Sequence, residues 1–486
     1  RPSQGGVKMS PLLCEMGNVE AQGYSYPRSD VPSAAPLPQH LRRCELPDIP
    51  TVSELEVVRH FTSLAQDTYS IDRGIYPLGS CTMKYNPKIH DEIASDSMFT
   101  SIHPLQPLST VQGSLEILHS LLTELCSLVG MDWGTLQSAG GAQGEYIGLH
   151  IIKSYHRKRG ESKRNTVLIP SNAHGTNPAS AAFCSMDVIE IPVNEKGLID
   201  TAALASLLNE NIAAVMLTNP NTVGSFETEM SKIADMVHSC GALLYYDGAN
   251  LNAIMEMIRP GEMGFDVMHV NVHKTFSTPH GGGGPGAGPV LVKAFLRGFL
   301  PVPDIIKGED GYSLSYDLKD SIGKTLGFWG NFPVLLRAYA YILTLGRKGL
   351  QYSSQIAVLN ANYLRARLSE AVGLGFATES LHEVVLSFRE LKERTGVTAL
   401  DVAKALIGRG FHPPTVYFPL IVSEAMMIEP TETEPLGSLD AFADALLSII
   451  SQAEKDPDSI KNVLTKVDEV TAARRPVLTW KDSVLN

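Results

Sequence analysis

Helical and β-rich segments alternate between residues 115 and 295, and this alternation limits the possible folds more than any other feature of the sequence. Residues 115–128 carry apolar side chains at helical spacing. The predicted strands are 166–170, 188–193, 213–218, 242–246 and 267–272, and the helices between them include 200–208, with Asp200 as candidate N-cap, and 230–238. Strands separated by helices predict an α/β fold whose mostly parallel sheet is covered on both faces.

The flanking regions differ from this stretch. Residues 1 to about 50 are rich in proline and glycine, which predicts an extended arm, with a disordered tail as the alternative. A helical pattern follows at 50–66, with Ser53 as candidate N-cap. The helices predicted after residue 330 are 334–345, 353–371 and 440–452, the last with Ser438 as candidate cap. The predicted parts are an arm with the first helices at 1–110, a large α/β domain at 111–330 and a smaller α+β domain at 331–486.

Charge and composition exclude several classes of partner. The 40 basic and 52 acidic side chains give a net charge of −12, which argues against binding to nucleic acid or to anionic membranes. No run of about 18 apolar residues occurs. The 6 cysteines form no Cys-x-x-Cys pair, so no zinc or redox motif is indicated. We therefore expect a soluble, cytoplasmic protein with reduced thiols and without a metal site.

Lys274 follows an apolar predicted strand and precedes the glycine-rich loop 281–286. Burial of an amine leaves a neutral nucleophile, which suits Schiff-base chemistry. Consecutive glycines let the backbone approach a bulky planar ligand, and His273 is a further candidate contact to that ligand. The alternative is a surface lysine before a flexible turn.

Asp247 stands at the end of the neighbouring predicted strand. A carboxylate there can keep the pyridine nitrogen of pyridoxal phosphate protonated, so that the ring accepts electrons. An aspartate that starts an Asp-Gly turn is the common alternative. The pairing of Asp247 with Lys274 on adjacent βα units favours the cofactor, and Ala249 joins the candidate binding residues.

Three further strand ends carry compatible groups. The small residues at 138–144 precede a helix, whose exposed N–H groups suit a phosphate, and Gly141, Ala142 and Gln143 are the candidates. The segment lacks the Walker and G-x-G-x-x-G patterns, which disfavours nucleotides. His174 could stack on the cofactor ring or be an ordinary loop histidine. Asn221 could bond the ring's 3′ oxygen. Together these groups predict a pyridoxal-phosphate enzyme of the type I fold.

Longer stretches of the chain resemble the glycine decarboxylases, the P proteins of the glycine cleavage system, and in particular the second subunit of their two-subunit form. The matching stretches are 76–88, 102–107, 141–146, 173–179, 218–224, 271–286, 410–415 and 429–432. The resemblance covers nearly the whole chain.

The resemblance implies a glycine dehydrogenase (aminomethyl-transferring, decarboxylating). Glycine would lose carbon dioxide on pyridoxal 5′-phosphate, and the aminomethyl group would pass to the lipoyl arm of the H protein. Lys274 would hold the cofactor as a Schiff base, Asp247 would face the pyridine nitrogen, His174 would stack on the ring, and Ala142 and Gln143 would bind the phosphate. The family also implies a first subunit as partner, in a heterotetramer with two copies of each chain.

Two other functions are compatible with the same residues. A type I aminotransferase or carbon–sulfur lyase would share Lys274 and Asp247. An aminotransferase usually has an arginine for the substrate carboxylate, and no such arginine can be singled out. The second alternative is a scaffold subunit without catalytic activity, against which the presence of both residues argues.

Overall fold

The computed structural model describes residues 11–16, 27–33, 35–45, 50–280, 286–376, 378–463, 469–476 and 478. The glycine run at 281–285 lies outside these residues. The chain divides into two compact units, residues 1–73 and 74–486, and each is considered by itself.

The described residues of the first unit form one long helix, α1 (Glu54–Asp67), and two short 3₁₀ turns at Leu13–Glu15 and Gln39–Leu41. Ser53 caps α1 as predicted. Its hydroxyl accepts the Glu56 N–H at 3.3 Å, and the Glu56 carboxylate accepts the Ser53 N–H at 2.7 Å. The Glu56 carboxylate also accepts the Ser53 hydroxyl at 2.8 Å, and the two bonds that it accepts lower the pKa of Glu56 because they favour the charged form.

The second unit is built on a seven-stranded sheet with the strand order β1-β7-β6-β5-β4-β2-β3. Its strands are β1 Trp133–Thr135, β2 Thr166–Pro170, β3 Asp187–Ile191, β4 Ile212–Leu217, β5 Leu243–Gly248, β6 Val267–Val270 and β7 Val290–Val292. The strands from β2 to β6 pair in parallel, whereas β7 runs antiparallel to both of its neighbours, β6 and β1. All five predicted strands are present, which confirms the mostly parallel α/β sheet.

Helices cover both faces of this sheet. Among the described residues the α-helices of the unit are α2 Lys88–Ser95, α3 Ser97–Thr100, α4 Gln112–Val129, α5 Gly141–Lys158, α6 Thr176–Phe183, α7 Thr201–Leu207, α8 Met230–Ser239, α9 Val272–Thr275, α10 Phe332–Leu368, α11 Arg389–Thr395, α12 Ala399–Gly408, α13 Leu436–Lys455, α14 Pro457–Lys461 and α15 Glu469–Arg474. Along β5, Leu244 and Tyr246 enter the core with α4 and α8, whereas Leu243 and Tyr245 enter the core with α5 and α6. Successive side chains of the strand therefore point to opposite faces of the sheet, and both faces are buried under helices.

Two capping predictions have different outcomes. Asp200 accepts the N–H groups of Ala202 and Ala203 at the start of α7, as predicted. Ser438 was expected to cap the last long helix, and this is wrong: α13 begins at Leu436 after Pro435, which places Ser438 inside the helix. Pro435 takes the N-cap position itself, with extended backbone and no capping side chain, because its ring already fixes φ near the value found there (−74°).

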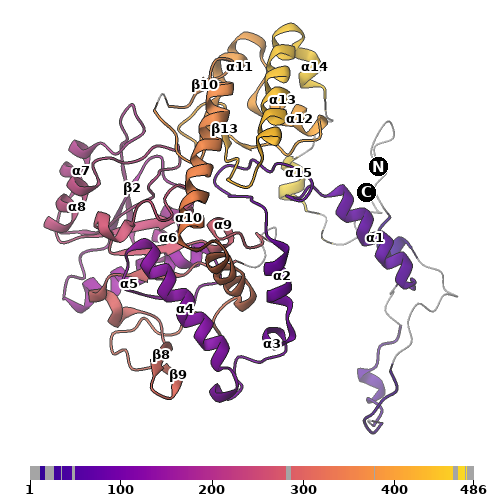
Figure 1. Ribbon diagram of the computed structural model, residues 1–486, viewed down its shortest axis with the longest axis vertical. Helices are drawn as coiled ribbons and strands as arrows, with labels where there is room; N and C mark the ends of the chain where they lie inside the picture. The colour runs from indigo at the N-terminus through magenta and orange to yellow at the C-terminus, as the bar shows by residue number, and fades with distance from the viewer. Residues whose placement is uncertain are drawn as a thin grey trace. The chain divides into compact units, whose positions relative to one another are not determined.

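The C-terminal part packs a second, antiparallel sheet against its own helices. Its strands are β10 Gly373–Leu374, β11 Val384–Ser387, β12 Thr415–Val416 and β13 Ala425–Ile428, in the order β10-β11-β13-β12, and a separate hairpin is formed by β8 Asp304–Gly308 and β9 Gly311–Ser315. Each sheet has its own hydrophobic core, and helix α10 connects the two (Figure 1). Leu335 packs in the core beside the seven-stranded sheet, and Leu364 packs in the core of the C-terminal sheet. The helix is interrupted at Gly346 (φ 58°, ψ −178°), where the first predicted C-terminal helix ends.

A strap formed by residues 76–86 also connects the two cores. Leu78 forms a β-bridge with Ile428, and Gly79 lies so close that an added Cβ would be 2.2 Å from Met427 Cγ. Further along, Lys84 Nζ donates to Glu432 at 2.6 Å and to Tyr341 at 3.2 Å. Burial alone lowers the pKa of Lys84, but Glu432 and Tyr341 raise it above its ordinary value, so the ammonium stays charged. In the part of the chain that is described, no helix combines the length and the apolar character needed to cross a bilayer.

The Lys84–Glu432 pair gives a stability prediction. Lys84→Met leaves the buried Glu432 carboxylate without its cation, so the free energy of unfolding should fall by about 3–5 kcal/mol. Lys158→Met is the matched control, because its bridge to Asp320 is exposed and should contribute only about 0–1 kcal/mol. Urea denaturation measures both, and adding Glu432→Gln to Lys84→Met should recover part of the loss. Equal effects of Lys84→Met and the control would contradict the buried-pair interpretation.

Candidate active site

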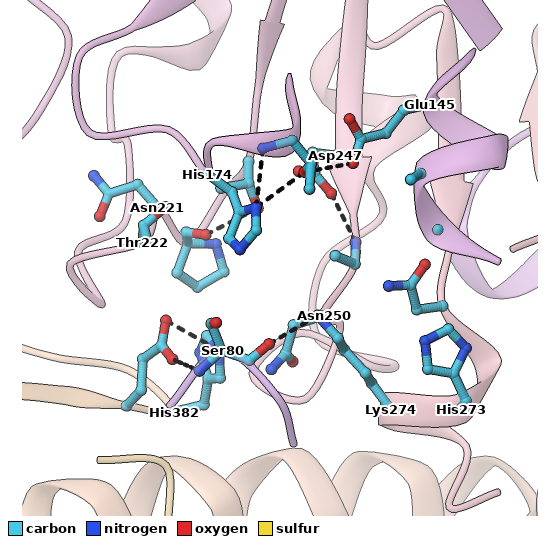
Figure 2. Close-up of a pocket in the computed structure, with 18 residues that line it drawn as sticks. Ser80, Glu145, His174, Asn221, Thr222, Asp247, Asn250, His273, Lys274 and His382 are labelled. Atoms are coloured by element: carbon cyan, nitrogen blue, oxygen red, sulfur yellow. Dashed lines mark hydrogen bonds and ion pairs between the residues drawn. The ribbon is translucent and has the colours of Figure 1, made fainter. Parts of the chain in front are cut away.

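A cavity of about 240 Å³ opens where the parallel strands of the large sheet end. One wall comes from the loops after β2, β4, β5 and β6 and from the first turn of α5. The opposite wall comes from the strap and from the segment that leads into β11. All the residues predicted for the cofactor site line this cavity except Gln143. Figure 2 shows Glu145, Asp247 and His174 on one side of the cavity and Ser80 and His382 on the other, with the Lys274 side chain extending toward Ser80.

Lys274 lies in the one-turn helix α9, four residues after β6 ends at Val270. The predicted strand continued to Val272, and this is wrong, because the chain turns into the helix at that residue. The turn lets the half-buried lysine reach across the cavity, where its Nζ donates to the Ser80 carbonyl oxygen at 2.8 Å. The strap therefore holds the amine in place.

Asp247 belongs to β5 and is 3% exposed. Its carboxylate accepts the Asn177 amide N–H at 2.8 Å and the Ala249 backbone N–H at 3.0 Å. His269 Nε2 lies 3.3 Å away without the alignment of a hydrogen bond, and burial lowers the pKa of His269 against the opposing effect of Asp247. Burial by itself raises the pKa of Asp247, yet the net shift is downward, since His269, Asn177 and Ala249 favour the charged form.

His174 sits in the loop between β2 and α6, and Thr176 fixes its ring. His174 Nδ1 lies 2.9 Å from the Thr176 hydroxyl oxygen and 3.2 Å from the Thr176 backbone nitrogen. The Phe418 ring packs against it in an edge-type contact, with 5.4 Å between ring centroids and 63° between ring planes. Burial lowers the pKa of His174, which favours a neutral imidazole.

The first turn of α5 brings backbone N–H groups to the cavity at Gly141 and Ala142. An added Cβ on Gly141 would lie 2.4 Å from Asn271 Oδ1, so only glycine permits this close approach. Gln143 points elsewhere: its oxygen accepts the Ala139 N–H at 2.7 Å and its amide donates to Thr325 at 3.1 Å. Its side chain braces the loop before the helix.

Three other predicted residues, Asn221, Ala249 and His273, also line the cavity. The Asn221 amide donates to the Gly197 carbonyl at 2.8 Å, and its oxygen accepts the N–H groups of Val223 and Ser225, both at 3.1 Å. These bonds account for a structural role of Asn221 in its loop. Burial, with His280 and Lys274 nearby, lowers the pKa of His273 to about 4, so its ring is neutral.

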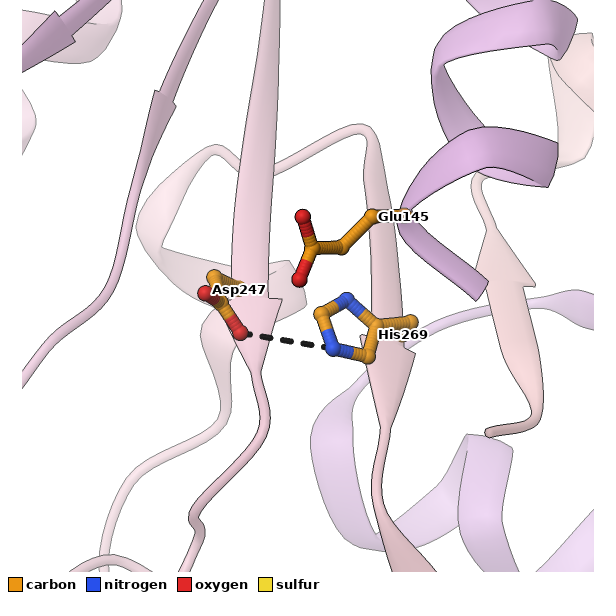
Figure 3. A group of neighbouring side chains, drawn as sticks. All are labelled: Glu145, Asp247 and His269. Atoms are coloured by element: carbon orange, nitrogen blue, oxygen red, sulfur yellow. Dashed lines mark ion pairs between the residues drawn. The ribbon is translucent and has the colours of Figure 1, made fainter. Parts of the chain in front are cut away.

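Several residues of the site were not found from the sequence. Figure 3 shows Glu145 and His269 beside Asp247. One carboxylate oxygen of each acid and one ring nitrogen of His269 all lie within 4.8 Å of one another. Burial and the Asp247 charge raise the pKa of Glu145 to about 7. On the other wall, Glu383 accepts the Ser80 N–H at 3.1 Å, and burial raises its pKa well above the ordinary value. Glu145 belongs to a stretch matched above, but no sequence pattern places Glu383 opposite Lys274.

Two family models match most of the chain. The one described as "Glycine cleavage system P-protein" matches residues 28–304, and the one described as "Glycine dehydrogenase, C-terminal domain" matches residues 353–469. A protein of Kosmotoga olearia is 52% identical over 466 residues, which are 94% of this chain and 96% of that protein. A protein of Listeria monocytogenes is 50% identical over 482 residues, 98% of this chain and 99% of that protein. Both are named "Probable glycine dehydrogenase (decarboxylating) subunit 2".

Solved structures share the fold at lower identity. The crystal structure of an inhibitor-bound glycine decarboxylase (P-protein) of the glycine cleavage system has a TM-score of 0.70 at 21% identity, covering 85% of this chain and 93% of that one. A glutamate decarboxylase of Lactobacillus brevis has a TM-score of 0.66 at 13% identity, covering 89% and 96%. These structures bear out the predicted fold class.

The contact between Gly141 and Asn271 gives a prediction for this site. Gly141→Ala must displace the buried Asn271 amide, so it should lower the free energy of unfolding by about 1–3 kcal/mol. Gly140→Ala is the control, since its backbone is extended (φ 178°) and an added Cβ meets nothing within 4 Å. Thermal and urea unfolding of both variants test the difference. A Gly141→Ala variant as stable as the control would show that the first turn of α5 has room for a side chain.

Proposed function

Because this chain belongs to the glycine cleavage system P-protein family, we propose that it catalyses the pyridoxal-phosphate-dependent decarboxylation of glycine and transfers the aminomethyl group to the lipoyl arm of the H protein. In this reaction it acts as subunit 2 of a glycine dehydrogenase (decarboxylating). The observation that carries the proposal is one cavity that holds an amine, Lys274, a buried carboxylate, Asp247, and the N-terminus of α5.

The residues present fit pyridoxal phosphate. Lys274 is the amine that would carry the cofactor's aldehyde carbon, and Gly141 and Ala142 offer N–H groups at a helix N-terminus, where a phosphate is stabilised. Gly141 lets the Asn271 side chain approach the start of α5 closely, and Asn271 Oδ1 is a buried acceptor without a hydrogen-bond partner there. When bound, the cofactor supplies an electron sink for the electron pair left on the substrate by departing carbon dioxide.

Asp247 and the strap prepare the site for this chemistry. Because its partners keep Asp247 ionised, it can hold a proton on a pyridine nitrogen. The Ser80 carbonyl accepts a hydrogen bond from Lys274, so it gives the free amine a fixed position whenever the lysine is not bonded to the cofactor. We assign ring stacking to His174, whose side chain lines the cavity, and a place beside the cofactor to His273 and Ala249.

The basic side chains that line the cavity favour a decarboxylase over an aminotransferase. Among the described residues that line it, none is an arginine. An aminotransferase keeps the substrate carboxylate through two half-reactions, and a guanidinium binds it in bidentate fashion. A decarboxylase must release this group, and a site without a fixed guanidinium suits release. Since Lys274 and Asp247 are both in place, a scaffold role without catalysis is disfavoured as well.

We further propose that the chain works with a homologous first subunit, in a heterotetramer with two copies of each, in the cytoplasm. The relatives' names, which include "subunit 2", support a partner subunit. The exposed face of α1 fits such a partner, because Leu55, Val58 and Phe61 are each more than half exposed at helical spacing. Apolar faces of this kind are typically buried in permanent complexes.

Exchange of glycine with labelled bicarbonate tests the proposed function. The chain, pyridoxal phosphate, lipoylated H protein and the first subunit should exchange label, and omission of either protein should reduce the rate by at least tenfold. Lys274→Ala should lower it by several orders of magnitude, because the nucleophile is lost. Borohydride reduction of the wild type followed by peptide mapping should find the cofactor on Lys274. Label on another lysine would refute the assignment.

Asp247→Asn separates binding of the cofactor from chemistry. The variant should still retain pyridoxal phosphate, because Lys274 and the first turn of α5 are unchanged, but its rate should fall more than tenfold since nothing holds the ring nitrogen protonated. Cofactor content by absorbance and the exchange rate are measured on the same sample. An exchange rate within tenfold of the wild type would contradict the role of Asp247.

A further inference from the structure

Glu145 has a buried carboxyl group for which the reaction above gives no role. It lies in the second turn of α5 and is 3% exposed. One oxygen, Oε1, lies 2.8 Å from the Thr176 hydroxyl, and the other, Oε2, is buried without a hydrogen-bond partner. The same hydroxyl contacts His174, so Thr176 links Glu145 to the proposed stacking residue.

The donors and acceptors along the contacts between His174, Thr176 and Glu145 require a proton on the Glu145 carboxyl group. The Thr176 backbone N–H points at His174 Nδ1 at 3.2 Å, which requires an unprotonated Nδ1. The Thr176 hydroxyl lies 2.9 Å from the same atom and has one hydrogen to donate there. Its oxygen can then only accept at its contact with Glu145. If the hydroxyl donated to Glu145 instead, two lone pairs would face each other between Thr176 and His174.

The neighbouring charges lead to the same proton position. One oxygen each of Glu145 and Asp247 lie within 4.8 Å in the protein interior, where two carboxylates do not both ionise. Asp247 accepts two N–H hydrogen bonds and lies beside His269, and together these outweigh the effect of its burial. For Glu145 the balance is the reverse, because burial and the Asp247 charge outweigh its interactions with Thr176, Ser180 and Asn177. The titratable groups that surround Glu145 are Asp247 and Tyr245 on β5, His269 on β6 and His174 before α6. The raised pKa of Glu145, about 7, agrees with this asymmetry.

We propose that Glu145 is a positioning residue that acts as a neutral acid: it donates to Thr176, Thr176 donates to His174 Nδ1, and the His174 ring is thereby fixed with its proton on Nε2. This inference deepens the proposed function and rests on it for the meaning of His174 and Asp247. A neutral Glu145 has a second consequence, since it leaves Asp247 as the single negative charge beside the proposed pyridine nitrogen. An ionised Glu145 would compete with the pyridine nitrogen for its proton. It would also draw the Thr176 hydroxyl hydrogen to itself, so that His174 would lose its hydrogen bond from this hydroxyl.

The pH dependence of stability tests the protonation state without any catalysis. A folded-state pKa raised from 4.5 to about 7 contributes stability that is fully present below pH 4.5 and is lost as the pH rises through 7. Glu145→Gln keeps an N–H donor to Thr176 but cannot ionise. The Tm of this variant minus that of the wild type should therefore rise between pH 5 and pH 8, in the full chain with and without pyridoxal phosphate. Glu229→Gln, a change at a half-exposed glutamate side chain, gives the background.

A level or falling difference would overturn the proposal, whether or not the protein decarboxylates glycine. Infrared difference spectra give a second readout on the same samples. At pH 6 the carbonyl stretch of protonated carboxyl groups should be weaker in Glu145→Gln than in the wild type, whereas the buried Glu383 contributes equally to both spectra. If the spectra of the two proteins agree in this region, Glu145 is ionised and the proposal fails.

Exchange activity then tests the positioning role. Glu145→Gln should exceed Glu145→Ala by at least tenfold in kcat, because the amide still donates to Thr176 and the methyl group cannot. The wild-type rate should also lose activity above pH 7 that Glu145→Gln retains. Equal kcat values for the two variants would refute the relay through Thr176, and no exchange in the wild type would instead refute the proposed function and leave the stability result valid.

Discussion

The site is organised around one buried negative charge, the carboxylate of Asp247 on the central strand β5. A charge in the protein interior is stable only if nearby dipoles and cations replace the water it has lost. Three residues stabilise the Asp247 charge in this way: Asn177 from α6, Ala249 from the turn after β5, and His269 from β6. The neighbouring acid must therefore carry the proton. Asp247 thus determines the charge state of the groups around it.

The strap provides the second constraint, because it determines what the Lys274 amine faces. Ser80 and Thr82 have positive φ angles of 62° and 50°, which non-glycine residues rarely adopt. Two buried acids of the C-terminal part hold these residues: Glu383 accepts the Ser80 N–H, and Glu429 accepts the Thr82 N–H at 3.0 Å. The Ser80 carbonyl is turned toward Lys274 as a result. Groups far apart in the chain thereby set the position of one carbonyl oxygen.

The strand ends were predictable because parallel strands place their carboxyl ends at one edge of a sheet. Lys274, Asp247 and His174 each follow a recognisable apolar strand, so local pattern sufficed to bring them together. Asn221 also follows a strand, but the sequence could not show that backbone groups of its own loop use its side-chain oxygen. Gln143 has the right position in sequence, yet its side chain faces Ala139 and Thr325. Side-chain direction depends on such partners, which sequence spacing does not reveal.

The sequence by itself determined the α/β class, the five parallel strands and the residues at their ends, because hydrophobic period and chain order carry this information locally. Only the tertiary structure decided that Glu145 lies beside Asp247, that Glu383 and Ser80 form the wall facing Lys274, and that Lys84 is buried with Glu432. These pairs join residues up to several hundred positions apart. Their charges follow from burial and from the partners that folding supplies, and neither quantity exists in the unfolded chain.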